Sequence, residues 1–204
     1  MNSALNCNIS FIGGGNMAQA LIGGLISRGL PENQIQVSDP VEQIRSILQE
    51  KNIAVFTDNA KAIENADVVV LAVKPQVLAD VLKPLHGLFE GKLIISIVAG
   101  VTIEIIAALT GTQRIVRVMP NTPALVQTGA HGMYADASVS QEDRNLTGKI
   151  LAATGLGLWV NTEAQIDAVT AVSGSGPAYF FYLMESMIRA GKNMGLDEKV
   201  AAAL

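Results

Sequence analysis

The sequence contains a single cysteine, so no internal disulfide can form, and a reducing compartment is the expected environment. No apolar run approaches the roughly 18 residues that a membrane-spanning helix requires. The first residues lack the positive and apolar regions of a signal peptide, which predicts a cytoplasmic protein. The cysteine itself, Cys7, precedes the first apolar run and is interpreted as a buried, inert thiol.

Basic runs and aromatic side chains are also scarce. The formal net charge is −4 without a basic cluster, which argues against a nucleic-acid partner. Aromatic residues make up 4% of a chain that is 50% hydrophobic, so the core should be aliphatic. There is no HExxH, paired-cysteine or EF-hand pattern, so no metal is predicted. A GxSxG elbow is also missing, which makes covalent acyl chemistry an unlikely mechanism.

The sequence does contain an alternation of short apolar runs and helix-like patterns. Residues 68–73 are apolar on both faces, which is typical of a parallel strand covered by helices on both sides. The alternation predicts a doubly wound α/β domain. Predicted strands cover residues 9–12, 35–38, 54–56, 68–73, 93–98 and 115–119. Predicted helices cover 16–28, 40–51, 59–65, 75–89 and 102–109, with Asp58 and Thr102 as N-caps.

The pattern changes after Pro123. Strands are predicted at 129–134 and 158–160, and a helix capped by Ser140 at 141–154. From residue 166 the chain reads as helical, with a flexible break at 173–177. We therefore expect a dinucleotide-binding domain at 1–163 and the start of an all-helical domain at 164–204. The last helix pattern stops after a few residues, which predicts an incomplete copy of a longer protein.

A glycine-rich turn follows the first predicted strand and precedes the first predicted helix. Gly13 permits the tight turn, Gly15 lets a pyrophosphate approach the backbone, and Ala18 lets the helix pack close to its strand. The helix N-terminus would offer N–H groups to the phosphates. This GxGxxA pattern predicts a dinucleotide site, although a glycine motif alone is weak evidence.

Further candidate residues follow the other predicted strands. Asp39 lies about 20 residues past the glycine loop, where an acid can bond the ribose of NAD, whereas Ser38 could donate to the 2′-phosphate of NADP. The sequence leaves this choice open, and an ordinary turn at Asp39 is an equal alternative. Lys74 follows the apolar run 68–73 and taken alone reads as a surface lysine.

Five segments together resemble the pyrroline-5-carboxylate reductase family: FIGGGNMA at 11–18, LAVKPQ at 71–76, SIVAGVTI at 96–103, RVMPNTP at 117–123 and AVSGSGPAYFF at 171–181. The resemblance implies a Rossmann domain followed by a helical dimerisation domain. It implies reduction of 1-pyrroline-5-carboxylate to L-proline, the last step of proline biosynthesis, with NADPH and possible use of NADH. Members of the family continue beyond this chain, into a loop that holds the substrate carboxylate.

The resemblance also assigns residues. Thr170 matches a hydroxyl position near the substrate, where it could hydrogen-bond the ring nitrogen of an iminium and fix its protonation. The predicted cofactor contacts are Ile12, Gly13, Gly14, Gly15, Asn16, Met17, Ser38, Pro40, Asn59, Ala72, Val73, Lys74, Ala99 and Asn121. Two of them, Ala72 and Asn121, are included because they follow the ends of predicted strands.

Two alternatives remain open at this stage. One is a related two-domain Rossmann reductase that acts on a hydroxy acid or a flavin-like carrier. Such a hydroxy-acid enzyme would use a lysine of its helical domain as the acid, and Lys192 is the main candidate, although a surface lysine is the better interpretation. The other is a nucleotide-binding protein without catalysis.

The apolar segment 178–188 predicts assembly. It is too hydrophobic to lie alone on a small domain, so we expect a homodimer formed through residues 164–204. Analytical ultracentrifugation of the full-length protein at micromolar concentration should give the sedimentation coefficient of a dimer or a larger oligomer. A monomer would contradict the prediction.

Overall fold

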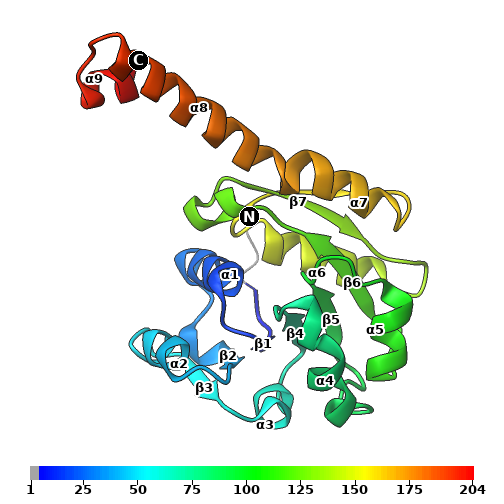
Figure 1. Ribbon diagram of the computed structural model, residues 1–204. Coiled ribbons are helices and arrows are strands. Elements are labelled where there is room, and N and C mark those ends of the chain that lie inside the picture. The colour runs from blue at the N-terminus through cyan, green and yellow to red at the C-terminus, as the bar shows by residue number, and fades with distance from the viewer. Residues whose placement is uncertain (1–4) are drawn as a thin grey trace.

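The computed structural model describes residues 5–204, which form an eight-stranded sheet with helices on both faces (Figure 1). The strand order is β3-β2-β1-β4-β5-β6-β7-β8. The first six strands are parallel, β7 is antiparallel to β6, and β8 is parallel to β7. The strands are β1 (Ile9–Ile12), β2 (Ile35–Ser38), β3 (Ala54–Phe56), β4 (Val68–Leu71), β5 (Leu93–Ser96), β6 (Ile115–Met119), β7 (Gly129–Tyr134) and β8 (Gly155–Trp159). The doubly wound α/β prediction is confirmed.

The centre of the sheet shows why a strand without alternation forms here. Every residue of β4 is buried, and the strand lies between β1 and β5. Val68 and Val70 join the core on one face, while Val69 and Leu71 join the core on the other. Both cores are largely aliphatic, as the composition predicts.

The helices are α1 (Asn16–Ser27), α2 (Glu42–Gln49), α3 (Asn59–Ile63), α4 (Leu78–Leu82), α5 (Ile103–Thr110), α6 (Gln141–Leu151), α7 (Gln165–Val169), α8 (Gly176–Asn193) and α9 (Glu198–Ala203). The predicted caps are confirmed, because the side chains of Asp58, Thr102 and Ser140 accept hydrogen bonds from backbone N–H groups of α3, α5 and α6. Cys7 is buried as expected, and its burial raises the pKa of the thiol to about 11, which keeps it protonated and unreactive.

Three sequence-based predictions are wrong in detail. The helix expected at 75–89 is three short pieces, because Pro84 starts a new 3₁₀ turn at Lys83–Leu85. The strand expected at 158–160 begins earlier, at Gly155. Glycine has no side chain, so this residue adds nothing to the apolar pattern of a strand. A Cβ added to Gly155 would lie 2.0 Å from Gly129 O. The flexible break expected at 173–177 is instead a π-helical turn, Thr170–Gly174, that runs into α8.

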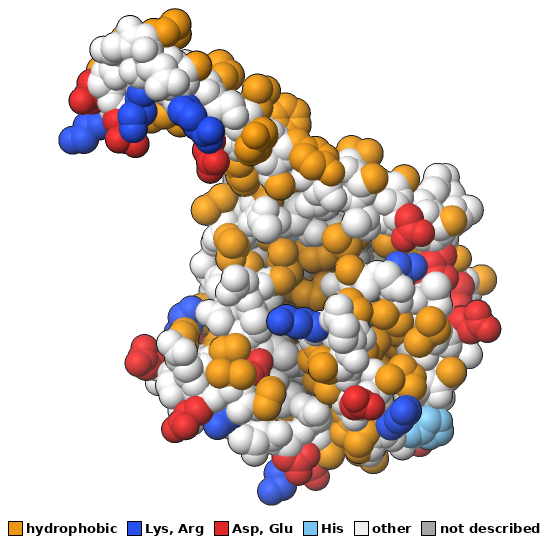
Figure 2. Space-filling view, viewed as in Figure 1, with side chains coloured by type: hydrophobic (Ala, Val, Ile, Leu, Met, Phe, Trp, Pro, Cys, Tyr) orange, Lys and Arg blue, Asp and Glu red, His pale blue; other side chains and the backbone are white. Residues whose placement is uncertain are grey.

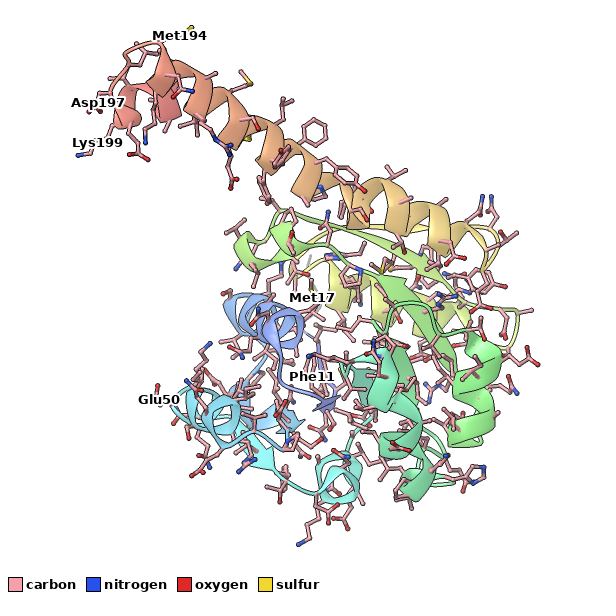
Figure 3. The ribbon with its side chains drawn as sticks, in the orientation of Figure 1. Phe11, Met17, Glu50, Met194, Asp197 and Lys199 are labelled. Carbon is pink, nitrogen blue, oxygen red and sulfur yellow. The ribbon has the colours of Figure 1, made fainter. Side chains whose placement is uncertain are left out.

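The chain ends in a helical arm, which we define as α8 and α9. Figure 1 shows α8 projecting from the sheet domain, with α9 folded back against its end. Figure 3 places Met194, Asp197 and Lys199 at the tip of this arm, far from Phe11 within the sheet. Asp197 caps α9, because its side chain accepts a hydrogen bond from Lys199 N. No helix among residues 5–204 is long and apolar enough to cross a membrane.

His131 on β7 is 1% exposed and is held in its neutral form. Thr154 Oγ1 lies 3.0 Å from His131 Nε2 and 3.2 Å from Leu151 O, within hydrogen-bond distance of both. The other ring nitrogen, Nδ1, is buried and has no hydrogen-bond partner within the described residues. Burial therefore lowers the pKa of His131, because a proton on Nδ1 would have no acceptor. This position gives His131 a structural role in the packing of β7.

We predict that this histidine makes stability depend on pH. The unfolded chain takes up the proton near its ordinary pKa of 6.5, whereas the folded protein resists it. The free energy of unfolding should therefore fall by about 1 kcal/mol per pH unit below 6.5, until the lowered pKa is reached. Urea melts between pH 7.5 and 5 should show this slope. His131→Gln should flatten it, and replacing the exposed His86 with Gln should not; equal slopes in all three proteins would contradict the assignment.

Candidate cofactor cleft and its helical cover

The carboxyl ends of five neighbouring strands lie in one row. A row of paired residues runs across β2, β1, β4, β5 and β6, and its members are, in that order, Ser38, Ile12, Leu71, Ser96 and Arg117. The loops that follow these strands therefore leave the sheet at the same edge, which is where ligands bind in open α/β sheets. Figure 2 shows a hollow with apolar side chains between the sheet domain and the segment that leads to the helical arm.

Each glycine of the loop after β1 has a different role. Gly13 has φ +98° and donates its N–H to Ser38 O at 2.8 Å, and an added Cβ would lie 2.7 Å from Ala72 O. At Gly14 a Cβ would lie 2.7 Å from Ile44 Cγ2. Gly15, the N-cap residue of α1, has no atom within 4 Å of an added Cβ, and no side chain caps the helix. Gly13 and Gly14 are needed for packing, whereas Gly15 keeps the approach to the helix N-terminus open.

Asp39 has a structural position at this edge. Its Oδ2 accepts from Gly14 N and its Oδ1 accepts from Val41 N, both at 2.8 Å, and the residue is 7% exposed. The carboxylate thus joins the glycine loop to the start of α2. Ser38 is 1% exposed, and its Oγ donates to Phe11 O at 3.5 Å. The ribose contacts considered for these two side chains stay predictions.

The other predicted contacts differ in how far they can be reached. Lys74 is exposed, and among the described residues its side chain has no hydrogen bond or ion pair. Figure 3 shows Met17 in the first turn of α1. Exposed or half-buried are Gly15, Asn16, Met17, Pro40, Asn59, Ala72, Val73, Lys74, Ala99 and Thr170, whereas Ile12, Gly13, Gly14, Ser38 and Asn121 are buried. The first group is the part of the prediction that a ligand can reach without rearrangement.

Asn121 connects the end of β6 to the helical cover, which we define as α7 and the π-helical turn. Its Nδ2 donates to Ser173 O at 3.0 Å, and its Oδ1 accepts from Ala130 N at 2.8 Å. Beside this bond, a Cβ at Gly174 would lie 3.1 Å from Met119 Cε, so the turn packs directly on the residue that ends β6. The direct cofactor contact predicted for Asn121 stays a prediction.

Thr170 opens the π-helical turn and is half-buried. Its Oγ1 donates to Ile166 O at 2.8 Å, which commits the hydroxyl proton to the backbone. The lone pairs of the oxygen can therefore accept a hydrogen bond but the group cannot also donate one. The substrate role predicted for Thr170 is consequently that of an acceptor.

The comparisons with known proteins match this arrangement. A family model described as "NADP oxidoreductase coenzyme F420-dependent" matches residues 8–100, and one for pyrroline-5-carboxylate reductase dimerisation matches residues 163–204. The chain is 51% identical over 199 residues to the pyrroline-5-carboxylate reductase of Pseudomonas aeruginosa, covering 96% of this chain and 73% of that protein. This chain belongs to the pyrroline-5-carboxylate reductase family.

Solved structures of this family superpose closely. The pyrroline-5-carboxylate reductase of Coxiella burnetii gives a TM-score of 0.91 at 40% identity, over 98% of this chain and 75% of that one. The Plasmodium falciparum pyrroline carboxylate reductase, determined with NADP bound, gives 0.89 at 28% identity with the same coverage.

In this family member, an arginine that the sequence analysis overlooked anchors the helical cover. Arg117 on β6 is 4% exposed, and its Nη1 lies 3.1 Å from Glu163 Oε1. The same oxygen accepts from Ile103 N (2.7 Å), and Asp167 on α7 lies 3.9 Å from Nη2. The signal was an arginine inside the apolar run 115–119, where a buried charge requires a partner.

Within residues 5–204 no group of His, Cys, Asp and Glu could hold a metal.

We predict that the loop glycines separate folding from cofactor binding. Gly13→Ala should lower the free energy of unfolding by at least about 1–3 kcal/mol, because the backbone conformation and the Ala72 carbonyl exclude a methyl group. Gly15→Ala should change stability by less than about 0.5 kcal/mol but weaken binding of a nicotinamide dinucleotide. Thermal melts and calorimetric titration measure both effects.

Gly23→Ala is the matched control, since a Cβ there also meets no atom within 4 Å but lies two turns further along α1. It should raise the free energy of unfolding by up to about 1 kcal/mol, the usual gain of alanine over glycine inside a helix, and it should leave dinucleotide affinity at the wild-type level. Wild-type dinucleotide affinity in Gly15→Ala would contradict the assignment of the loop.

Proposed function

We propose that this protein reduces 1-pyrroline-5-carboxylate to L-proline with a hydride from NADPH, with NADH as the alternative donor, as the last step of proline biosynthesis. Membership of the reductase family supports the reaction, and the glycine loop supports the cofactor. The observation that carries the proposal is the position of the π-helical turn. Asn121 and Met119 hold this turn against the end of β6, beside the predicted nicotinamide end of the cleft.

The residues present fit a dinucleotide. The open space at Gly15 and the uncapped start of α1 offer N–H groups to a pyrophosphate. Ala99, in the loop after β5, is exposed and small. When bound, the cofactor supplies the hydride. The protein then has to place the imine carbon near the nicotinamide and hold the substrate in one orientation.

Thr170 controls the protonation of the substrate in this proposal. A cyclic imine accepts a hydride readily only as its iminium, whose nitrogen carries a proton. Because the Thr170 hydroxyl donates to Ile166 O, its oxygen faces the substrate as an acceptor and favours the N–H form. Hydride addition to the iminium gives the neutral secondary amine directly, so no separate proton donor is required for that step.

Membership of this family also supports a homo-oligomer and a division of the chain into two domains. Residues 164–204 are proposed as the start of the helical dimerisation domain, after a dinucleotide-binding domain at 1–163. Exposed apolar side chains on α8, among them Tyr179 (67% exposed) and Phe180 (69%), suit burial against a second copy of the chain. Homo-oligomerisation and a cytoplasmic location are part of the proposal.

No observation favours the hydroxy-acid alternative. Its candidate acid, Lys192, lies in the last turn of α8 and forms an ion pair with Glu198 at 3.0 Å. Both side chains are substantially exposed, which is the ordinary setting of a surface pair. An absorbance assay of NADPH oxidation with pyrroline-5-carboxylate and with simple keto acids separates the two functions, because only the imine should be reduced.

We predict that Thr170→Ala lowers kcat/KM for pyrroline-5-carboxylate by about 10-fold to 100-fold, since a hydrogen bond to a charged group is lost. The optimum should also move to lower pH, where more substrate is already iminium. NADPH affinity should not change.

Thr170→Ser keeps the hydroxyl and should retain most of the activity, and Thr162→Ala, at an exposed position before α7, serves as the control. If Thr170→Ala leaves turnover, substrate KM and the pH profile unchanged, the role is wrong.

A further inference from the structure

We propose that Arg45 and Lys61 form a subsite for the 2′-phosphate of NADPH and thereby set the preference for NADPH over NADH. This inference rests on the proposed function for the identity of the cofactor. It concerns a pocket next to the cleft, at the carboxyl ends of β2 and β3.

Asp39, the acid that would recognise the ribose of NAD, already accepts hydrogen bonds from the backbone. In dinucleotide folds, an acid after the second strand bonds the ribose 2′-OH of NAD, and a nearby arginine accommodates the 2′-phosphate of NADP. Both carboxylate oxygens of Asp39 accept backbone N–H groups, from Gly14 and Val41, in a site that is 7% exposed. The carboxylate therefore holds the glycine loop in place from a site with little exposure.

A pocket of about 310 Å³ lies beside this aspartate. Its polar lining comes from Arg45 and Gln49 of α2, Thr57 and Asp58 after β3, and Lys61 of α3. The backbone bond from Asp39 N to Phe56 O (3.1 Å) joins the loops after β2 and β3, so the pocket adjoins both. Ser38 and Asn59, two of the predicted cofactor contacts, are the last residue of β2 and the first of α3.

Arg45 is placed to bind an anion. Its Nη1 donates to Asp39 O at 2.7 Å, which fixes the guanidinium against the loop after β2. Nε and Nη2 make no hydrogen bond or ion pair to the described residues, so part of the donor fork stays available. A planar fork of this kind matches a phosphate, and holding it in advance reduces the entropy lost on binding.

The charges of the pocket favour a phosphomonoester. Arg45 and Lys61 contribute two positive charges, and within residues 5–204 the Lys61 ammonium has no ion-pair partner. The opposing acid, Asp58, is already the cap of α3, where its Oδ1 accepts from Ala60 N and Lys61 N. The two cations and the one acid leave a net charge of +1 in the pocket.

The decisive experiment compares ligands that differ only in the 2′-phosphate. Calorimetric titration of the wild-type protein should show tighter binding of 2′,5′-ADP than of 5′-AMP, while inorganic phosphate alone should bind weakly. Arg45→Gln should weaken 2′,5′-ADP binding by about 10-fold to 100-fold, the usual effect of losing charge-assisted hydrogen bonds. Lys61→Gln should have a smaller effect, because this side chain is exposed.

The controls separate recognition from loop stability. Binding of 5′-AMP and kcat/KM with NADH should stay at wild-type levels in both variants, whereas kcat/KM with NADPH should fall. Arg45→Lys should restore part of the preference, and Arg28→Gln, at the exposed end of α1, should change none of these values.

Parallel losses for both ligands would overturn the proposal and give Arg45 a purely structural role. Equal wild-type affinity for 2′,5′-ADP and 5′-AMP would also overturn it. A wild-type protein that prefers 2′,5′-ADP in an Arg45-dependent way but reduces no imine would support the subsite and contradict the proposed reaction.

Discussion

The close approach of Gly13 to the carbonyl of Ala72 is the constraint on which the rest of the site depends. The chain leaves β1, the central strand of the nucleotide half, and must turn at once between the loops after β2 and β4. Only a residue without Cβ and with positive φ fits there, since an added Cβ would lie 2.7 Å from the carbonyl oxygen. That turn brings Gly14 N to Asp39 and points the start of α1 into the cleft.

The helical cover depends on a second set of contacts. Arg117 and Glu163 hold the start of α7 to β6 and α5, and Asn121 bonds the π-helical turn a few residues later. A helix that only followed the sheet in sequence could adopt many angles to it. These partly buried polar bonds are lost unless the angle is kept, so they fix where Thr170 lies relative to the strand ends.

Much of this arrangement could be predicted from the sequence, for identifiable physical reasons. The run 68–73 is apolar on both faces, which indicates a strand covered on both sides, and the glycine loop lies between an apolar run and a helix-like pattern, which indicates a turn from strand to helix. The bond from Gly14 to Asp39 and the ion pair of Arg117 with Glu163 could not be predicted, because the partners are distant in the sequence. Two local interruptions were also missed. Pro84 divides a predicted helix, and Gly155, the first residue of β8, lacks the side chain that would have marked the start of the strand. In both cases a single residue overrides a periodicity that surrounds it.

The central claim is that the strand-end cleft and the helical cover together direct a hydride onto a cyclic imine. The most direct measurement follows the hydride itself, with NADPH deuterated on one or the other face of nicotinamide C4 and pyrroline-5-carboxylate as the acceptor. The account predicts L-proline with one deuterium, at the ring carbon that carried the imine, from one of the two labelled cofactors, and unlabelled proline from the other. Oxidation of NADPH without labelled proline from either cofactor would contradict it.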